Sequence, residues 1–349
     1  MKTNSFEISF ELVGQQLGQD IYSDQGILLL KKGITLTETH IVLLHNYKFG
    51  TQVEIIAPTR SNDKLNVKMQ KLYDENLAEI KDLFQNISLN DSPPIKELIN
   101  AYQPLIDQAI DHTDSINYLH GIKDYDEYTY RHSINVGMIS AVIGKLLGRT
   151  TKEISLLGQM GLLHDIGKTM VSPEILNKPG KLDKDEWEEI KRHTIYGYKI
   201  LKEVPDLNIH IPASALLHHE RIDGSGYPNQ VKEKDLPFLV QILSVADTYD
   251  AISTERIYQA KKPDFVGINI LVEEAYNNKL NPAIVFPFVR YLMRQYLRKQ
   301  VTLNTGDHGE IIFIHDDEPH QPLIVTNDEY IDLRKNRKLQ LFDVVKEHA

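Results

Sequence analysis

The 349-residue chain contains no cysteine and a single tryptophan. The absence of cysteine excludes disulfide bonds and thiolate-held metal ions, so any transition-metal site in this chain has to use His, Asp or Glu. A chain without cysteine also fits the reducing cytoplasm, where disulfide bonds are rare. We therefore expect a cytoplasmic protein that is stabilised by an ordinary hydrophobic core.

Long apolar runs are also missing. The run at residues 238–243 is interrupted by Gln241 and is much shorter than the ~20 residues that a membrane-spanning helix requires. The first 14 residues contain no apolar core of the length found in a signal peptide. We therefore expect no membrane segment.

The chain has no excess of basic residues. It contains 39 Lys and Arg against 49 Asp and Glu, which gives a net charge of -10. Long nucleic acids favour a basic surface, so we do not expect one as a partner. A small phosphate ester stays a candidate ligand, because metal ions and a few local cations can hold it.

Hydrophobic periodicity and turn residues divide the chain into four parts and predict a mainly α fold. Apolar runs around Gly26 and a helix capped by Thr37 predict a small α/β unit at the start. The helices between 67 and 118 could form a homodimer or pack within one chain. The predicted parts are residues 1–57 as the α/β unit, 58–118 as a linker (58–65) with helices, 119–299 as a helical bundle and 300–349 as a small β appendage.

The predicted bundle contains histidines and aspartates on or beside apolar helices. A carboxylate such as Asp247, beside Val245 and Ala246, is costly to bury unless a cation neutralises it. One histidine or one His-Asp pair is weak support for a site, and His315-Asp316 is such a pair in the β appendage. The combination points to a metal site. Its candidate ligands are His132, His164, Asp165, His193, His218, His219 and Asp247.

These seven candidates exceed what one ion needs. Imidazole and carboxylate ligands without sulfur suit Fe, Mn, Zn or another first-row ion. Two ions ~3.5–4 Å apart would hold a bridging hydroxide and clamp the oxygens of a phosphate undergoing in-line displacement. Adjacent helical positions diverge by about 100°, so His164 and Asp165 could bind one ion, or Asp165 could bridge two.

Lys168 follows Asp165 by three residues and therefore points to nearly the same side of the chain. A cation there could bind phosphate and stabilise charge in the transition state. A lysine that interacts with a helix C-terminus explains the spacing equally well.

The segment after His219 predicts an unusual loop, because two glycines flank Ser225 and a Tyr-Pro pair follows. Its position directly after two candidate ligands favours a loop that shapes the mouth of a site. The alternative is a plain surface turn.

Residues 119–299 contain, in order, the motifs YRHSINV, LLHDIGK, EIKRHTIYGYKIL, HHERIDGSGYP and ILSVADTYDAI. Taken together, these motifs resemble the HD-GYP family, a branch of the HD-domain phosphohydrolases. The flanking regions are similar to a small domain and an appendage that often accompany such modules. The resemblance implies a bacterial signalling phosphodiesterase that hydrolyses cyclic di-GMP to pGpG, in some members onward to GMP, with Fe or Mn at a bi- or trinuclear centre.

The resemblance also implies residue roles. The seven candidates would be metal ligands, with Asp165 as the bridge, and Lys168 would contact the scissile phosphate. Asp250 and Arg256 occupy positions associated with holding the site and the substrate phosphate. The loop residues implied to shape the substrate pocket are Gly224, Gly226, Tyr227 and Pro228.

Two departures from the family pattern change these expectations. Trinuclear members have a Glu where this chain has Tyr128, and Glu127 would face about 100° away, so we predict two metal ions. The usual Arg-Pro-Tyr followed by a basic residue is here Arg256-Ile257-Tyr258-Gln259, with Lys261 or Lys262 as substitutes. The metal chemistry is therefore better determined than the identity of the dinucleotide.

Three alternatives stay open at this point. The chain could be an HD phosphohydrolase acting on another nucleotide, or a binding module that senses a cyclic dinucleotide without hydrolysing it. A structural helical protein with incidental histidines would bind no metal.

Overall fold

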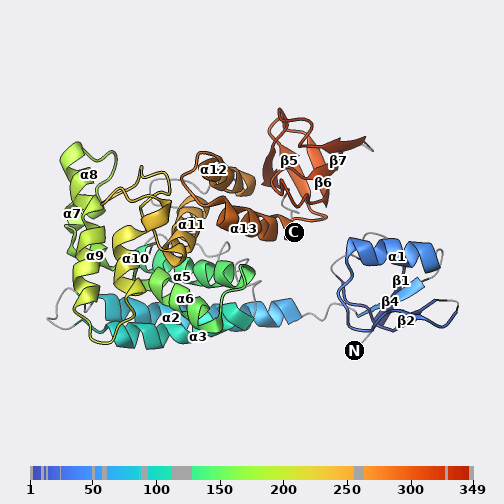
Figure 1. The fold of residues 1–349 in the computed structure, drawn as a ribbon, viewed down its shortest axis with the longest axis horizontal. Coiled ribbons are helices and arrows are strands. Elements are labelled where there is room, and N and C mark those ends of the chain that lie inside the picture. Colours follow the sequence, from blue (N-terminus) through green and yellow to red (C-terminus); the bar gives the residue numbers. More distant parts are fainter. Residues whose placement is uncertain are drawn as a thin grey trace. The chain divides into compact units, whose positions relative to one another are not determined.

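The computed structural model describes residues 3–8, 12, 15–23, 25–48, 52–56, 61–85, 87, 93–111, 128–254, 263–326 and 329–345. The fold is mainly helical, with small sheets, as the sequence predicts (Figure 1). The chain divides into two compact units, Met1–Lys68 and Met69–Ala349. The four predicted domain boundaries stay a prediction.

The first unit combines short antiparallel strand pairs with one helix. The side chain of Thr37 accepts a hydrogen bond from the His40 backbone N–H at 3.3 Å, so the predicted helix cap is confirmed. Strand β1 was not predicted. Its mostly polar sequence TNSFE has no clear strand pattern, and it forms a strand by pairing with β4. The elements are β1 (Thr3–Glu7) paired with β4 (Gln52–Ile56), β2 (Ile21–Tyr22) paired with β3 (Leu28–Leu30), and α1 (Glu38–Lys48).

Two long helices, α2 (Ser61–Gln85) and α3 (Ile95–Asp111), precede the bundle. The linker prediction for residues 58–65 is wrong from Ser61 onward, because α2 begins there. Ser, Asn and Asp, which suggested a linker, are also the residues favoured at helix N-termini.

Helix α5 (Tyr128–Leu146) is apolar on nearly every side and packs against α3, α6 (Thr151–Leu163) and α11 (Phe238–Ser253). The predicted capping box at Asp183 and Glu186 is confirmed by reciprocal hydrogen bonds of 2.9 and 2.8 Å. The elements are α5 (Tyr128–Leu146), α6 (Thr151–Leu163), η2 (Ile166–Met170), α7 (Pro173–Leu176), α8 (Lys184–Lys191), α9 (His193–Lys202), α10 (His210–Leu217), η3 (Glu233–Asp235), α11 (Phe238–Ser253), α12 (Asp264–Tyr276) and α13 (Pro282–Arg294).

Close backbone contact between α5 and α6 brings their ends together. A Cβ atom on Gly161 of α6 would lie 2.4 Å from the Cα atom of Gly137 in α5, so only glycine fits there. The connection between the two helices is short. His132 near the start of α5 and His164 just after α6 therefore lie side by side, with ring centroids 5.2 Å apart.

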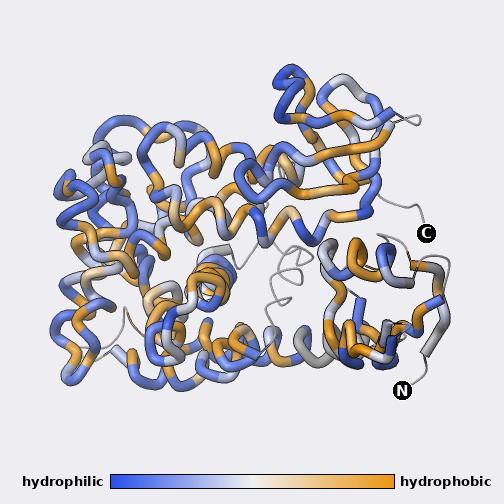
Figure 2. Tube along the Cα trace, turned by 45° about the vertical axis from the view of Figure 1, so that its right-hand side comes forward, coloured by the Kyte–Doolittle hydropathy of each residue, from blue (hydrophilic) through white to orange (hydrophobic). Residues whose placement is uncertain are grey.

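The C-terminal segment forms the predicted β appendage, an antiparallel five-stranded sheet in the order β8-β7-β6-β5-β9. Strand β9 packs against α12. Figure 2 shows hydrophobic residues along both the helices and the strands of this unit. Among the described residues, no helix combines the length and hydrophobicity needed to cross a membrane. The strands are β5 (Gln300–Leu303), β6 (His308–Phe313), β7 (Leu323–Thr326), β8 (Glu329–Asp332) and β9 (Leu341–Val344).

The first prediction tests the α5–α6 contact with Gly161→Ala. Alanine has the higher helix propensity, worth about 1 kcal/mol, but its Cβ would strike backbone atoms of Gly137 and Val136. Overpacking of this kind costs about 1–3 kcal/mol or more, so we expect a lower free energy of unfolding in urea. Lys152→Ala, at an exposed position of α6, is the control and should stay within about 0.5 kcal/mol of wild type. Equal stability of the two variants would contradict the contact.

The second prediction concerns His320, which is buried beside the C-terminal sheet. Burial lowers the pKa of its imidazole from 6.5 to about 4, so the folded state binds its proton less tightly than the unfolded state. This contribution to stability is complete above pH 6.5 and is lost as the pH falls toward 4. We expect His320→Gln to flatten the fall of the unfolding free energy across this window, measured by urea titration. An unchanged slope of the unfolding free energy against pH would show that His320 does not contribute to the loss of stability in this window.

Candidate metal centre

The structure brings all seven candidate ligands together, although they come from distant parts of the sequence. Each of these seven residues lies on a helix or at a helix end, so its side chain is held on a rigid element. His132 lies on α5, His164 and Asp165 directly follow α6, His193 begins α9, His218 and His219 follow α10, and Asp247 lies on α11. All except the partly exposed His219 are buried.

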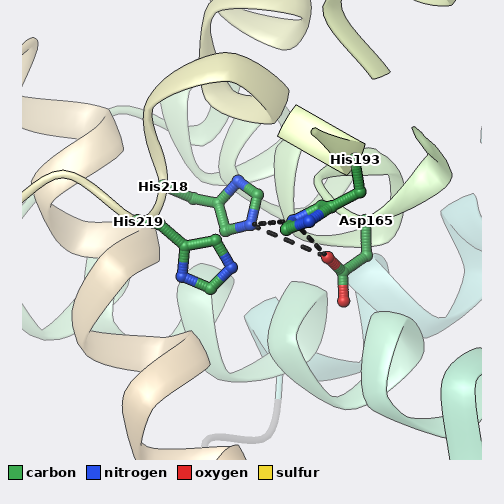
Figure 3. A group of neighbouring side chains, drawn as sticks. All are labelled: Asp165, His193, His218 and His219. Atoms are coloured by element: carbon green, nitrogen blue, oxygen red, sulfur yellow. Dashed lines mark hydrogen bonds and ion pairs between the residues drawn. The ribbon is translucent and has the colours of Figure 1, made fainter. Parts of the chain in front are cut away.

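Asp165 occupies the middle of this arrangement and faces histidines on two sides. Its Oδ1 lies 3.3 Å from Nε2 of His193 and 3.7 Å from Nε2 of His218, as Figure 3 shows. Its Oδ2 lies 3.5 Å from Nε2 of both His132 and His164. Two clusters able to hold a metal ion therefore share one carboxylate. They are Asp165 with His193, His218 and His219, and Asp165 with His132 and His164.

Backbone carbonyls determine which ring nitrogen carries the proton in three of the histidines. Nδ1 of His164 donates to the Gly161 carbonyl at 2.6 Å, and Nδ1 of His193 donates to the Ile190 carbonyl at 2.7 Å. Nδ1 of His218 lies 3.1 Å from a carbonyl of the preceding helical turn. A carbonyl oxygen only accepts, so Nδ1 must be the donor and Nε2 presents its lone pair to the centre.

His132 is oriented by a carboxylate instead. Its Nδ1 donates to Oδ2 of Asp250 at 2.7 Å, and Oδ1 of Asp250 accepts from Nδ2 of Asn135 at 3.0 Å. Nε2 of His132 points to the other side, 3.1 Å from Oδ1 of Asp247. Asp250 was predicted at the substrate. Because it is buried and both its oxygens are occupied within the protein, the geometry assigns it to orienting His132.

The two central carboxylates are ionised despite their burial. Burial opposes their ionisation, but Lys168 holds the pKa of Asp165, and a hydrogen bond from His132 holds the pKa of Asp247, well below the usual range. Burial lowers the pKa of His164 to about 3. Burial alone would also lower the pKa of His132, but hydrogen bonds to Asp247 and a second aspartate raise it to about 9. The centre thus attracts positive charge.

Several acceptor atoms in the centre lack donors, which is the arrangement a bound cation requires. Nε2 of His193 and Nε2 of His218 lie 3.3 Å apart, and both present lone pairs. Among the described residues, Nε2 of His164 and Oδ1 of Asp165 are buried atoms without a hydrogen bond of good geometry. Imidazole nitrogens and carboxylate oxygens are the ligands of first-row divalent ions, so the residues fit such metals.

Lys168 and the glycine loop border the centre. The Nζ atom of Lys168 contacts Oδ2 of Asp165. The ring of Tyr227 stacks on His219 with centroids 4.6 Å apart, and a Cβ atom on Gly226 would lie 2.4 Å from the His219 carbonyl oxygen. The predicted loop therefore lies directly on a candidate ligand. Gly224 has φ +85°, a conformation that favours glycine, and Pro228 follows a cis peptide bond.

Glu220 anchors this loop and was not among the predicted site residues. Its buried carboxylate accepts hydrogen bonds from the backbone N–H groups of Asn229 at 2.6 Å and Val231 at 3.2 Å. A charged residue between His219 and the glycines carried no signal of burial. By contrast, His315 and Asp316 pair with Asp332 and Arg290, outside both clusters.

Some predicted positions lie outside the described residues. These include Arg256, the only predicted substrate-binding residue among them, and the side chain of Tyr128, whose backbone begins α5. Their roles stay predictions. The others are Glu127, Ile257, Tyr258, Gln259, Lys261 and Lys262.

The region that contains these residues matches a known protein family. The HD domain family model matches residues 120–284, which contain all seven candidate ligands. A cyclic di-GMP phosphodiesterase from Pseudomonas aeruginosa is 29% identical over 238 residues, 68% of this chain and 57% of that protein. Another from Thermotoga maritima is 33% identical over 215 residues, 59% of this chain and 53% of that protein. Residues 120–284 thus match the HD domain family, and the chain is similar to proteins named as cyclic di-GMP phosphodiesterases.

A further relative differs in its named substrate. A 3'3'-cGAMP-specific phosphodiesterase from Vibrio cholerae is 36% identical over 155 residues, 44% of this chain and 33% of that protein. The chain spans less than two thirds of the length of each of these relatives. The solved structure of an HDG"Y"P protein from Bdellovibrio bacteriovorus has a TM-score of 0.55 at 18% identity and covers 83% of this chain and 99% of that chain. This likeness supports the fold.

The third prediction concerns metal-dependent stability. A ligand that binds only the folded state at 100 times its Kd adds about 2.7 kcal/mol to the unfolding free energy. We expect Mn²⁺, added anaerobically to metal-stripped protein, to raise the Tm of wild type and not that of Asp165→Ala. Asp316→Ala, from the His-Asp pair outside the centre, is the control and should respond like wild type. A Tm that rises equally in all three proteins would place the bound ions elsewhere.

Proposed function

We propose that this chain is a metal-dependent phosphodiesterase that hydrolyses cyclic di-GMP to pGpG, in the cytoplasm, at a binuclear centre. One observation carries the proposal: Asp165 directs one carboxylate oxygen to each of two histidine clusters. A carboxylate in that position is suited to bridge two ions. Relatives of the chain are named as cyclic di-GMP and 3'3'-cGAMP phosphodiesterases.

The residues divide naturally between two ions, with Fe or Mn expected from the ligand types. Oδ1 of Asp165 would serve one ion and Oδ2 the other. Bound divalent ions lower the pKa of water, which supplies a hydroxide nucleophile at neutral pH, and they offset phosphate charge. The first ligand set is His193, His218 and His219, and the second is His132, His164 and Asp247.

The protein's own groups prepare the site for a phosphodiester. The rings of His164, His193 and His218 each direct Nδ1 to a backbone carbonyl, which leaves Nε2 facing the centre and ready to bind an ion. Lys168 is partly exposed and lies against the shared carboxylate, where its ammonium can turn to a phosphate oxygen and offset the charge that develops during displacement. Tyr227 covers His219 and keeps its ring in place.

The identity of the dinucleotide rests on fewer residues than the metal chemistry. The Gly224–Pro228 segment lies beside the centre and would contact the substrate outside the reacting phosphate. Cyclic di-GMP is the proposed substrate because two relatives that each match more than half of this chain are named for it. Ile257 and Gln259 depart from the family pattern, so 3'3'-cGAMP is the second candidate.

The fourth prediction tests the reaction. Anaerobically purified, metal-loaded protein should convert cyclic di-GMP to pGpG, measured by chromatography, and its metal content should approach two ions per chain. We expect Lys168→Met to lower kcat by roughly 10²–10³-fold, the usual cost of losing one charge-stabilising donor. Lys199→Met, at an exposed position of α9, is the matched control and should keep wild-type kcat.

Three outcomes would overturn parts of this proposal. Metal-loaded protein that releases no product from any cyclic dinucleotide is not the proposed enzyme, and tight binding without turnover would make it a sensor. Faster hydrolysis of 3'3'-cGAMP would replace the substrate. A wild-type protein that binds no metal would reduce the centre to a structural cluster.

A further inference from the structure

A line of buried polar side chains leads from the candidate metal centre to helix α2. Tyr73 on α2 contacts Oδ1 of Asn135 through its hydroxyl at 2.7 Å. Nδ2 of Asn135 contacts Oδ1 of Asp250 at 3.0 Å, and Oδ2 of Asp250 contacts Nδ1 of His132 at 2.7 Å. All four residues are at most 4% exposed, so bulk water does not compete for these hydrogen bonds.

The chemistry of the groups determines the direction of every bond in this line. The Asp250 carboxylate can only accept, so Asn135 must turn its NH₂ group toward it. The amide oxygen of Asn135 then faces Tyr73, whose hydroxyl must donate. The other oxygen of Asp250 receives the Nδ1 proton of His132. With Nδ1 as the donor, Nε2 of His132 faces the shared carboxylate of Asp165.

Each hydrogen bond in this line strengthens the next one toward His132. Donation by Tyr73 polarises the Asn135 amide, which becomes a stronger donor to Asp250. A well-satisfied Asp250 carboxylate holds the His132 ring in one tautomer and one orientation. Carboxylates that bind the far nitrogen of a metal-ligating histidine raise metal affinity in this way.

A second buried tyrosine provides a natural comparison. Tyr102 on α3 is fully buried, and its hydroxyl donates to the backbone carbonyl of Ile134 at 2.7 Å, one residue before Asn135. Both tyrosines therefore fasten a long helix to the same part of α5. Only the bond from Tyr73 continues through side chains to a candidate ligand.

We propose that Tyr73 is a positioning residue for the metal centre, acting on His132 through Asn135 and Asp250. This inference rests on the proposed function, because it takes His132 as a metal ligand. Helix α2 is also the first helix after the strands of the N-terminal unit in the sequence. A displacement of α2 that breaks the bond from Tyr73 would therefore lower the metal affinity of the centre.

The test compares Tyr73→Phe with Tyr102→Phe, each of which loses one buried hydroxyl. The readout is the Kd of Mn²⁺ for the full-length, metal-stripped protein, measured anaerobically by titration calorimetry. Loss of a direct partner of a ligating histidine costs about 10–100-fold in metal affinity. Because Tyr73 lies two hydrogen bonds further away, we expect a smaller loss, about 3–10-fold, for Tyr73→Phe. Tyr102→Phe should leave the Kd unchanged, even where both variants lower Tm equally.

A double-mutant cycle with Asp250→Asn tests whether Tyr73 acts on His132 through Asp250. If Tyr73 acts through Asp250, Tyr73→Phe should weaken Mn²⁺ binding in the wild-type background and add nothing in the Asp250→Asn background. Equal Kd values for Tyr73→Phe and Tyr102→Phe would overturn the inference. Additive losses in the cycle would overturn the route through Asp250.

These outcomes separate the inference from the proposed function. A wild-type protein that binds Mn²⁺ without hydrolysing a cyclic dinucleotide would refute the enzyme and still allow the comparison of Kd values. An active wild type whose Mn²⁺ affinity is unchanged by Tyr73→Phe would keep the enzyme and refute the positioning role. A wild type without Mn²⁺ affinity would refute both.

Discussion

The convergence of acceptor atoms on Asp165 is the constraint on which the rest of the bundle depends. Nε2 atoms of four histidines lie 3.3–3.7 Å from its two oxygens, inside a region that bulk water does not reach. The carboxylate and the Nε2 lone pairs of His164, His193 and His218 repel one another unless a cation lies between them. The apolar core of the surrounding helices holds this set of side chains in place.

Two structural features allow the helices to hold these side chains close together. Glycines remove the Cβ atoms that would keep the backbones apart: a Cβ on Gly161 would meet Gly137, and one on Gly167 would lie 1.9 Å from the His193 carbonyl oxygen. Nδ1 hydrogen bonds to the preceding helical turn then fix the rings of His164 and His193 locally. Ring orientation at these positions thus depends on the helical turn that directly precedes each candidate ligand.

His132 is held differently, and this difference has a consequence for regulation. Its ring depends on Asp250 of another helix, 118 residues away, and through Asn135 on Tyr73 of α2. A ligand supported by its own helix moves with that helix. Under the positioning role that we propose for Tyr73, a candidate ligand supported across three helices would respond to their relative positions, and a change in α2 would reach the centre through His132.

Much of the centre could be predicted from the sequence alone. Without cysteine, a metal site had to be built from His and Asp, and the ordered motifs named the seven candidates that the structure brings together. Local features were also accessible, such as the capping box at Asp183, because its partners lie three residues apart. Only the tertiary structure decided that the two oxygens of Asp165 face different clusters, that Asp250 orients His132, and that Tyr73 belongs to the same network. These relations join residues far apart in the chain, and contacts of that kind leave no periodic pattern in a single sequence.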